Sequence, residues 1–220
     1  MKKLKYGVGI NDADYVLRIY EELPRTNGKR NQKLIWRCPF YGRWVNMLQR
    51  CYSKFCQEKQ PSYKGCSVCE EWLTFSNFKS CMEQQDWEGC DLDKDLLVKG
   101  NKIYSPETCV FIDKRLNKFL VKRDKCRGDY PLGVSYHTNP KRISPLKHPY
   151  RADISDRGER ICLGHYLTPE EAHKAWQKAK IKKAQDLAAS QTDERIVQGL
   201  LRVADKIQYD LDNSLETKDF

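Results

Sequence analysis

The sequence lacks any long hydrophobic run, and its N-terminus has no apolar core. No apolar stretch approaches the roughly 20 residues that a membrane-spanning helix needs. The opening residues MKKLKYGVGINDADY are basic, but they contain no apolar segment long enough for a signal peptide. We therefore expect a cytoplasmic protein that does not contact a membrane.

A second closely spaced cysteine pair is also absent. The chain has ten cysteines, but Cys66 and Cys69 form the single CxxC motif. A structural zinc site needs four ligands, usually from two close pairs. In a cytosolic protein we expect reduced thiols in the core, with a structural Zn²⁺ as the less favoured alternative. The cysteines that could complete such a site only by folding together are Cys51, Cys56, Cys81, Cys90 and Cys109.

Histidine is scarce, and the first half of the chain has none. The four histidines are residues 137, 148, 165 and 173. No histidine is therefore available locally as a base or metal ligand before residue 137. We interpret His165 and His173 as ordinary surface or helix residues, because no cysteine pair accompanies them.

Basic residues are abundant and unevenly distributed. The net charge is +10, and residues 114–151 hold eleven Lys and Arg against two acidic residues, a local excess of +9. A basic segment of this density favours a polyphosphate partner, and double-stranded DNA is the prediction. The alternatives are a solvated surface neutralised by acids from elsewhere in the fold, or an acidic protein partner.

Composition and periodicity predict an α+β protein, with 40% hydrophobic and 32% charged residues. We predict an N-terminal arm over 1–35, followed by helices over 40–52 and 69–82. Two short strands over 90–98 and 108–112 follow, with a turn at Lys99-Gly100-Asn101. Asp113 is then the expected N-cap of a helix starting at Lys114.

A second domain is predicted after a basic linker at 122–130. Residues 131–137, 150–154 and 160–166 have strand composition. Thr168, Pro169 and Glu171 mark the start of a helix, as N-cap, first-turn proline and capping-box partner. The predicted domain boundaries are 36–121 and 131–190. The last segment, 191–220, is acidic and contains a helix near 193–209 that either packs on the second domain or forms a homodimer.

The stretch LDKDLLVKGNKIYSPETCVFI, residues 92–112, has the residues of a phosphodiesterase site. A ββα unit can hold one divalent ion between its first strand and its helix. Asp93 and Asn117 suit these two positions, and both offer oxygen, which matches Mg²⁺ better than Zn²⁺. The ion would bind the scissile phosphate, while a neighbouring base activates water.

These residues resemble a known family. The phrases YGRW, GCSVCEEW, LDKDLLVKGNKIYSPETCVFI, LGVSYH and LTPEEAHKAW are similar to bacteriophage HNH homing-type endonucleases with a C-terminal Apetala-type (ethylene-response-factor-like) DNA-binding domain. The resemblance covers about residues 35–190. It implies a ββα-metal nuclease domain over 36–121, an Apetala-type domain over 131–190, and one Mg²⁺ or Mn²⁺. If the chain is phage-encoded, the compartment is the host bacterial cytosol.

The resemblance assigns roles to individual positions. Asp93 corresponds to the strand metal ligand and Asn117 to the helix ligand, whereas Lys94 stands where the family has its general-base histidine. Thr108 stands where the family has its middle asparagine. Three hypotheses follow. In the first, Lys94 is a cation that stabilises the phosphate, and Asp95 or a metal-bound hydroxide is the base. In the second, Lys94 is itself the base, with a lowered pKa. In the third, the unit is inactive and the protein only binds DNA, as a regulatory or anti-defence protein.

The resemblance also implies that the three-stranded sheet lies in the major groove of DNA. Side chains alternate along a strand, so one face contacts DNA and the other packs on the helix. Asp153 is expected on the DNA face beside basic residues. The predicted DNA-binding residues are Ser135, His137, Arg151 and Arg160 on the sheet, Lys141 and Arg142 in an inserted loop, and Lys122, Arg123, Lys125 and Arg127 in the linker.

Overall fold

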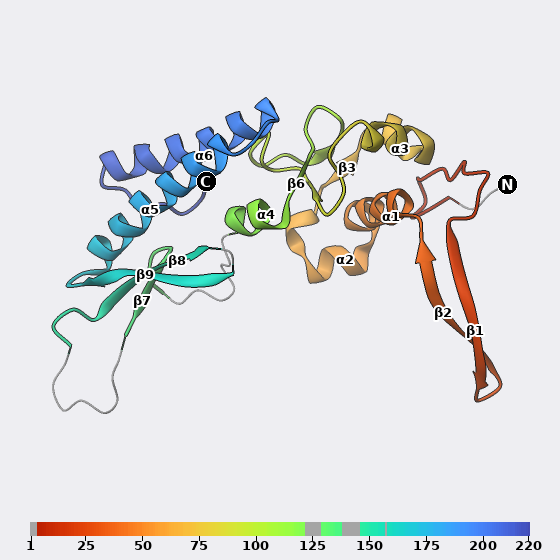
Figure 1. The fold of residues 1–220 in the computed structure, drawn as a ribbon, viewed down its shortest axis with the longest axis horizontal. Helices are drawn as coiled ribbons and strands as arrows, with labels where there is room; N and C mark the ends of the chain where they lie inside the picture. Colours follow the sequence, from red (N-terminus) through yellow and green to blue (C-terminus); the bar gives the residue numbers. More distant parts are fainter. Residues whose placement is uncertain (1–3, 122–128, 138–145, 157) are drawn as a thin grey trace. The chain divides into compact units, whose positions relative to one another are not determined.

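The computed structural model describes residues 4–121, 129–137, 146–156 and 158–220, and it is a mixed fold of helices and strands (Figure 1). The chain forms two compact units, residues 1–95 with 100–111, and residues 96–99 with 112–220. In the described part of the chain, no helix is both long enough and apolar enough to cross a bilayer. The predicted linker and loop residues Lys122, Arg123, Lys125, Arg127, Lys141 and Arg142 lie outside the described residues.

The N-terminal region forms a β-hairpin where the sequence suggested an extended arm. Strands β1 (Arg18–Thr26) and β2 (Lys29–Arg37) pair antiparallel. Asn27 and Gly28 both have positive φ, 49° and 71°, as a two-residue hairpin turn requires. The sequence analysis missed the two strands because they bury neither face completely.

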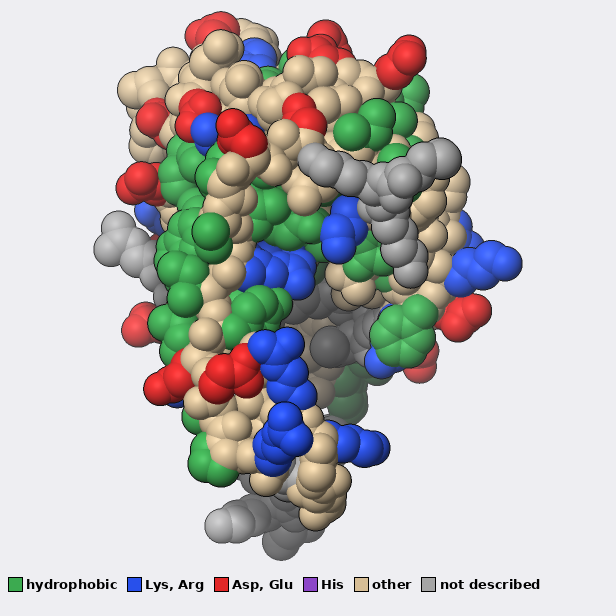
Figure 2. Space-filling view, turned by 90° about the vertical axis from the view of Figure 1, so that its right-hand side faces the viewer, with side chains coloured by type: hydrophobic (Ala, Val, Ile, Leu, Met, Phe, Trp, Pro, Cys, Tyr) green, Lys and Arg blue, Asp and Glu red, His purple; other side chains and the backbone are tan. Residues whose placement is uncertain are grey.

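The hairpin exposes apolar side chains. Ile19, Leu34 and Trp36 are all exposed. Figure 2 shows hydrophobic side chains beside Lys and Arg side chains on the face where the hairpin lies.

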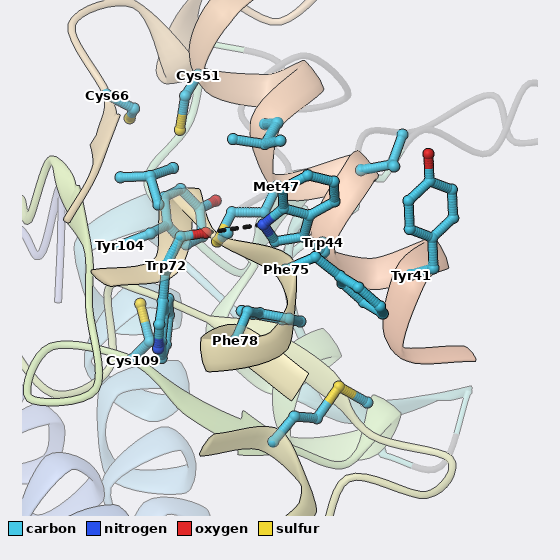
Figure 3. Packing of buried hydrophobic residues seen from close by; sticks show 14 of the residues in the cluster. Tyr41, Trp44, Met47, Cys51, Cys66, Trp72, Phe75, Phe78, Tyr104 and Cys109 are labelled. Carbon is cyan, nitrogen blue, oxygen red and sulfur yellow. Dashed lines mark hydrogen bonds between the residues drawn. The ribbon is translucent and has the colours of Figure 1, made fainter. Parts of the chain in front are cut away.

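The core of the first unit is built from aromatic side chains (Figure 3). Trp44 is fully buried, and its indole N–H donates a 2.7 Å hydrogen bond to the carbonyl oxygen of Trp72. The ring of Phe75 lies 5.5 Å from that of Trp44, and Phe78 meets Trp72 edge-on at 5.2 Å. The helical elements are α1 (Pro39–Tyr52), α2 (Lys54–Lys59), α3 (Phe75–Glu83) and the 3-10 helices η1 (Pro61–Tyr63) and η2 (Glu71–Leu73).

The helix predicted over 69–82 begins only at Phe75. The residues before it belong to a strand region, in which β3 (Ser67–Val68) pairs in parallel with β5 (Ile103–Tyr104). The amide of Cys69 continues this pairing with a 2.9 Å bond to the carbonyl of Tyr104. Another two-stranded sheet joins β4 (Asp91–Asp93) to β6 (Val110–Ile112).

The second unit has the predicted three-stranded sheet and its helix. β7 (Val134–Tyr136), β8 (Tyr150–Asp156) and β9 (Glu159–Tyr166) form an antiparallel sheet in the order β7-β8-β9. Helix α5 (Pro169–Ala189) packs on this sheet, as Figure 1 shows. The Thr168 hydroxyl accepts from the amide of Glu171, and the Glu171 carboxylate accepts from the amide of Leu167, so the predicted cap is present.

The acidic C-terminal segment is the helix α6 (Glu194–Asp212), which packs along α5. Beyond it, the buried His173 is tied to the chain end. Its Nδ1–H donates to the carbonyl of Leu132 at 2.9 Å, and its Nε2 accepts from the amide of Thr217 at 3.0 Å. His173 is therefore a structural residue in one fixed neutral tautomer.

Helix α4 (Lys114–Leu120) belongs to the second unit, although the sequence placed it with the first. Asp113 caps it as predicted, accepting from the amide of Leu116 at 2.7 Å. Helix α4 contacts α5, because the ammonium of Lys180 on α5 lies 3.7 Å from the ring centroid of Phe119 on α4.

Candidate nucleic-acid interface and metal site

Three of the predicted DNA-binding side chains, Ser135, His137 and Arg151, lie on one face of the three-stranded sheet. Residues paired directly across an antiparallel sheet point to the same side. Ser135 pairs with Arg151. Arg151 pairs in turn with His165, whose ring lies 5.7 Å from that of His137. The prediction that Ser135, His137 and Arg151 share a face is confirmed.

Asp153 links the two arginines of this face. Its Oδ1 accepts a 2.8 Å hydrogen bond from Nε of Arg151, and its Oδ2 lies 3.4 Å from Nε of Arg160. Asp153 is itself buried, with 6% of its surface exposed, whereas Arg160 is exposed. Hydrogen bonding to this carboxylate raises the pKa of Arg151 above its usual value. The carboxylate thus hydrogen-bonds to the Arg151 guanidinium and forms an ion pair with Arg160.

The opposite face of the sheet is covered by α5. Ala152, between Arg151 and Asp153 in sequence, is completely buried and pairs with Val134 on one side and Gly164 on the other. Ala152 therefore lies on the packed face, while Arg151 and Asp153 lie on the other face, where Asp153 is also buried.

The DKD segment follows β4 and forms a tight loop. The side chain of Lys94 is buried, and its ammonium donates to Oδ1 of Asp95 at 2.5 Å and to the carbonyl of Asn101 at 2.9 Å. Oδ1 of Asp93 accepts from the amide of Asp95 at 2.9 Å. Both hydrogen bonds are donated by the ammonium within its own loop, so this geometry favours a structural role for Lys94 over that of a general base.

Asn101 closes the same loop, as its predicted turn role requires. Its amide nitrogen donates to the carbonyls of Lys94 at 2.9 Å and Ile103 at 2.7 Å, while its amide oxygen accepts from the Ile103 amide at 3.0 Å. Thr108, at the position of the family's middle asparagine, donates to the carbonyl of Ile103 at 2.6 Å. Both residues therefore stabilise the loop.

Replacing Asn101 should destabilise this loop measurably. Asn101→Ala removes three hydrogen bonds at a buried position and is expected to cost about 2–3 kcal/mol, since buried groups left unpaired cost about 1–3 kcal/mol. Urea denaturation measures the change. The control is Asn46→Ala on the exposed face of α1, for which we expect a change within about 0.5 kcal/mol. Equal effects of the two substitutions would contradict the loop role.

The predicted metal ligands are divided between the units. Asp93 belongs to the first unit and Asn117 to the second, so their pairing stays a prediction. Among the residues that the structure describes, no three His, Cys, Asp or Glu side chains converge on a common point. The donor chemistry of Asp93 and Asn117 is carboxylate and amide oxygen, which fits Mg²⁺ or Mn²⁺, ions that keep several water ligands.

Two buried cysteines of the first unit are core thiols. Cys51 and Cys109 are buried, and burial raises the pKa of each thiol to about 12. Thiols of this kind are protonated and unreactive at neutral pH.

Comparison of the chain with protein-family models, with curated proteins and with solved structures yields no match. The function is therefore inferred from the geometry of the molecule.

Five basic side chains that line one cavity were not predicted as functional residues. They are Lys114, Arg115 and Lys118 on α4, and Lys180 and Lys183 on α5. Because these cations come from distant parts of the chain, no local sequence signal identifies them as one group.

Proposed function

We propose that this protein is a metal-dependent DNA endonuclease of the HNH type that is positioned on duplex DNA by the open face of the β7-β8-β9 sheet. The observation that carries the proposal is the Arg151–Asp153–Arg160 cluster beside Ser135 and His137 on that face. Three strands of a twisted sheet present such a face to the major groove. Arginine forks then bind guanine edges or phosphates.

Pre-positioning of the arginines supports this proposal. A free arginine side chain loses rotamer freedom on binding, at a cost of roughly 0.5–1.5 kcal/mol for each side chain that is immobilised. Asp153 has already restricted Arg151 and Arg160 in the free protein, so part of this cost is met during folding. The same carboxylate orients each guanidinium, which favours a defined contact over general attraction to phosphate.

Cleavage is assigned to the segment around β4. Asp93 ends β4, β4 pairs with β6, and the capped helix α4 carries Asn117, in the strand–loop–strand–helix order that the family resemblance implies. Asp93 and Asn117 would hold a single Mg²⁺ or Mn²⁺, and the ion would stabilise charge on the phosphate. Lys94 holds the loop closed, and Asp95, which is exposed, is the residue in this segment that can accept a proton from water.

A second function is favoured by one observation. Lys94 occupies the position of the family's general base, yet its ammonium is tied to Asn101 and Asp95 within the loop. A DNA-binding protein without nuclease activity would retain this loop for stability alone. The two functions share duplex binding and differ in cleavage.

The deciding experiment is incubation of supercoiled plasmid with the protein and Mg²⁺ or Mn²⁺, next to duplex binding measured by fluorescence anisotropy at several salt concentrations. Nicking that requires the divalent ion supports the endonuclease. Salt-dependent binding without nicking, on host and phage DNA alike, establishes the non-cutting function. Absence of binding at low salt would refute both.

Replacing Arg151 should weaken duplex binding strongly. Arg151→Ala removes a positioned guanidinium, and the loss of one bidentate base contact corresponds to about 1–3 kcal/mol, or about 5- to 150-fold in the dissociation constant for a preferred site. Anisotropy titration measures it. The control is Arg195→Ala, an arginine also paired to an aspartate but on α6, away from the sheet face. Equal affinities of the two variants would exclude the sheet face as the contact.

A further inference from the structure

The second unit contains a cavity of about 870 Å³ that the duplex contact does not use as a whole. β7 pairs with β8 at Tyr150–Ala152, and the next residues of β8, Asp153, Ile154 and Ser155, line the cavity. The cavity is bounded by α4, β8 and α5, and its volume lies in the range of small-molecule sites. It meets the DNA face at Ser135 and Arg160.

The charge of the lining is strongly positive. Six cations line the cavity, from three elements that are distant in sequence: Lys114, Arg115, Lys118, Arg160, Lys180 and Lys183. Asp153 is the carboxylate in the lining, and it is already engaged by Arg151. Asp156, close by, lies 2.7 Å from the ammonium of Lys183 and 3.5 Å from Arg115.

Lys180 is the most unusual member of this group. Its side chain is buried, with 6% of the residue exposed, and its ammonium donates to the carbonyl of Phe119 at 2.5 Å. Within the described ranges no carboxylate forms an ion pair with it, and its charged neighbour is the like-charged Lys183. Burial, followed by this repulsion, lowers the pKa of Lys180 to about 7. A buried cation of this kind is stabilised by an anion that enters the cavity.

Aromatic rings also line the cavity. Tyr130 and Tyr136 lie with ring centroids 6.2 Å apart and planes inclined by 20°, and Trp176 and Phe220 lie on the side of Lys180. Planar rings beside a cluster of cations are the combination that binds both the base and the phosphate of a nucleotide.

We propose that this cavity is a binding site for a nucleoside phosphate, with its phosphate on the cations of α4 and α5 and its base against the tyrosine rings. The ligand is either a free nucleotide or an unpaired nucleotide at the end of a DNA strand. Binding of a DNA strand end rests on the proposed DNA function, whereas binding of a free nucleotide does not.

The site has a defined pH dependence. A phosphate bound beside Lys180 favours the charged ammonium and raises the pKa of Lys180 above about 7. Binding then takes up a proton between that pH and the higher pKa of the complex. The affinity is therefore expected to fall as the pH rises from 7 to 9, by at most tenfold for each pH unit. The other charged side chains that line the same cavity are Lys114, Arg115, Lys118, Asp153, Arg160 and Lys183.

The test is isothermal titration calorimetry of the full chain at pH 6.5 and 8.5 with dATP, dAMP, inorganic phosphate and deoxyadenosine as separate probes. We expect one saturable site for dATP and dAMP, tighter at pH 6.5, and weaker binding of phosphate or nucleoside alone. Lys180→Met should weaken dATP binding at pH 6.5 by about tenfold or more and remove the pH dependence. Methionine fills the same apolar space, and thermal melting checks that the variant folds.

Lys178→Met is the control, because Lys178 is exposed on the same helix and does not line the cavity. Absence of saturable binding to every probe, or equal losses in the two variants, would overturn the proposal. A pentadeoxyadenylate with a 5′-phosphate that competes with dATP identifies a DNA strand end as the source, and failure to compete identifies a free nucleotide. Duplex binding by the Lys180→Met protein is expected to be unchanged. Loss of nucleotide binding with normal duplex binding therefore concerns the cavity alone, whereas absence of duplex binding in the wild-type protein concerns the proposed DNA function.

Discussion

Asp93→Ala is expected to abolish Mg²⁺-dependent plasmid nicking while leaving duplex affinity unchanged when metal is absent. The carboxylate is the strand ligand of the proposed ion, and a bound metal contributes several kcal/mol of transition-state stabilisation. Because each 1.36 kcal/mol is a factor of ten in rate, the expected loss is about a thousandfold. The measurement is the initial rate of conversion of supercoiled to open-circular plasmid at saturating Mg²⁺.

The matched control is Asp86→Ala, which removes an exposed carboxylate shortly before β4 in the same unit. It should cut at the wild-type rate. Nicking by Asp93→Ala at more than a tenth of the wild-type rate would remove Asp93 from the metal site. Lys94→Met distinguishes the roles left open by the sequence: a folded variant that still nicks shows that the lysine is not the base.

Gly133→Ala is expected to destabilise the second unit by about 2–5 kcal/mol. Gly133 has a φ of +79°, where a non-glycine residue costs about 1–2 kcal/mol. A Cβ atom there would lie 1.9 Å from Cδ1 of Trp176, and relief of such overpacking costs about 1–3 kcal/mol more. The carbonyl of Gly133 also accepts from the amide of Asp153 at 2.8 Å, so the shift should loosen β8. Urea denaturation and amide exchange at Asp153 measure both effects.

Gly158→Ala separates the two contributions to this loss. Gly158 also has a positive φ, +91°, but a Cβ atom there meets nothing within 4 Å. It should therefore show the backbone cost alone, about 1–2 kcal/mol. If both variants lose the same stability, contact with Trp176 does not restrict residue 133, and that wall of the nucleotide cavity is less rigid than its geometry indicates.

Local signals in the sequence were sufficient for several elements. The apolar spacing of Tyr41, Trp44 and Leu48 predicted α1, and the caps at Asp113 and Thr168 placed the starts of α4 and α5. These features depend on neighbours within a few residues, and side-chain caps and helical periodicity act at that range. Alternation along the strands likewise predicted which residues share the open sheet face.

Other features could not be derived from local signals. The sequence left the role of Lys94 open, and the structure supports a structural role because the ammonium meets the carbonyl of Asn101 across a loop. The hairpin over 18–37 lacks a clearly alternating pattern, so its strands were not predicted.

The sequence by itself determined the basic character of the protein, its α+β class and the alternation that puts Ser135, His137 and Arg151 on one face of a three-stranded sheet. The tertiary structure decided that α4 joins the second unit and that Lys180 is buried among cations from α4, α5 and β9. The physical reason is that the charge state of a side chain depends on burial and on its spatial neighbours. Those neighbours come from chain segments tens of residues apart, and only packing brings them together.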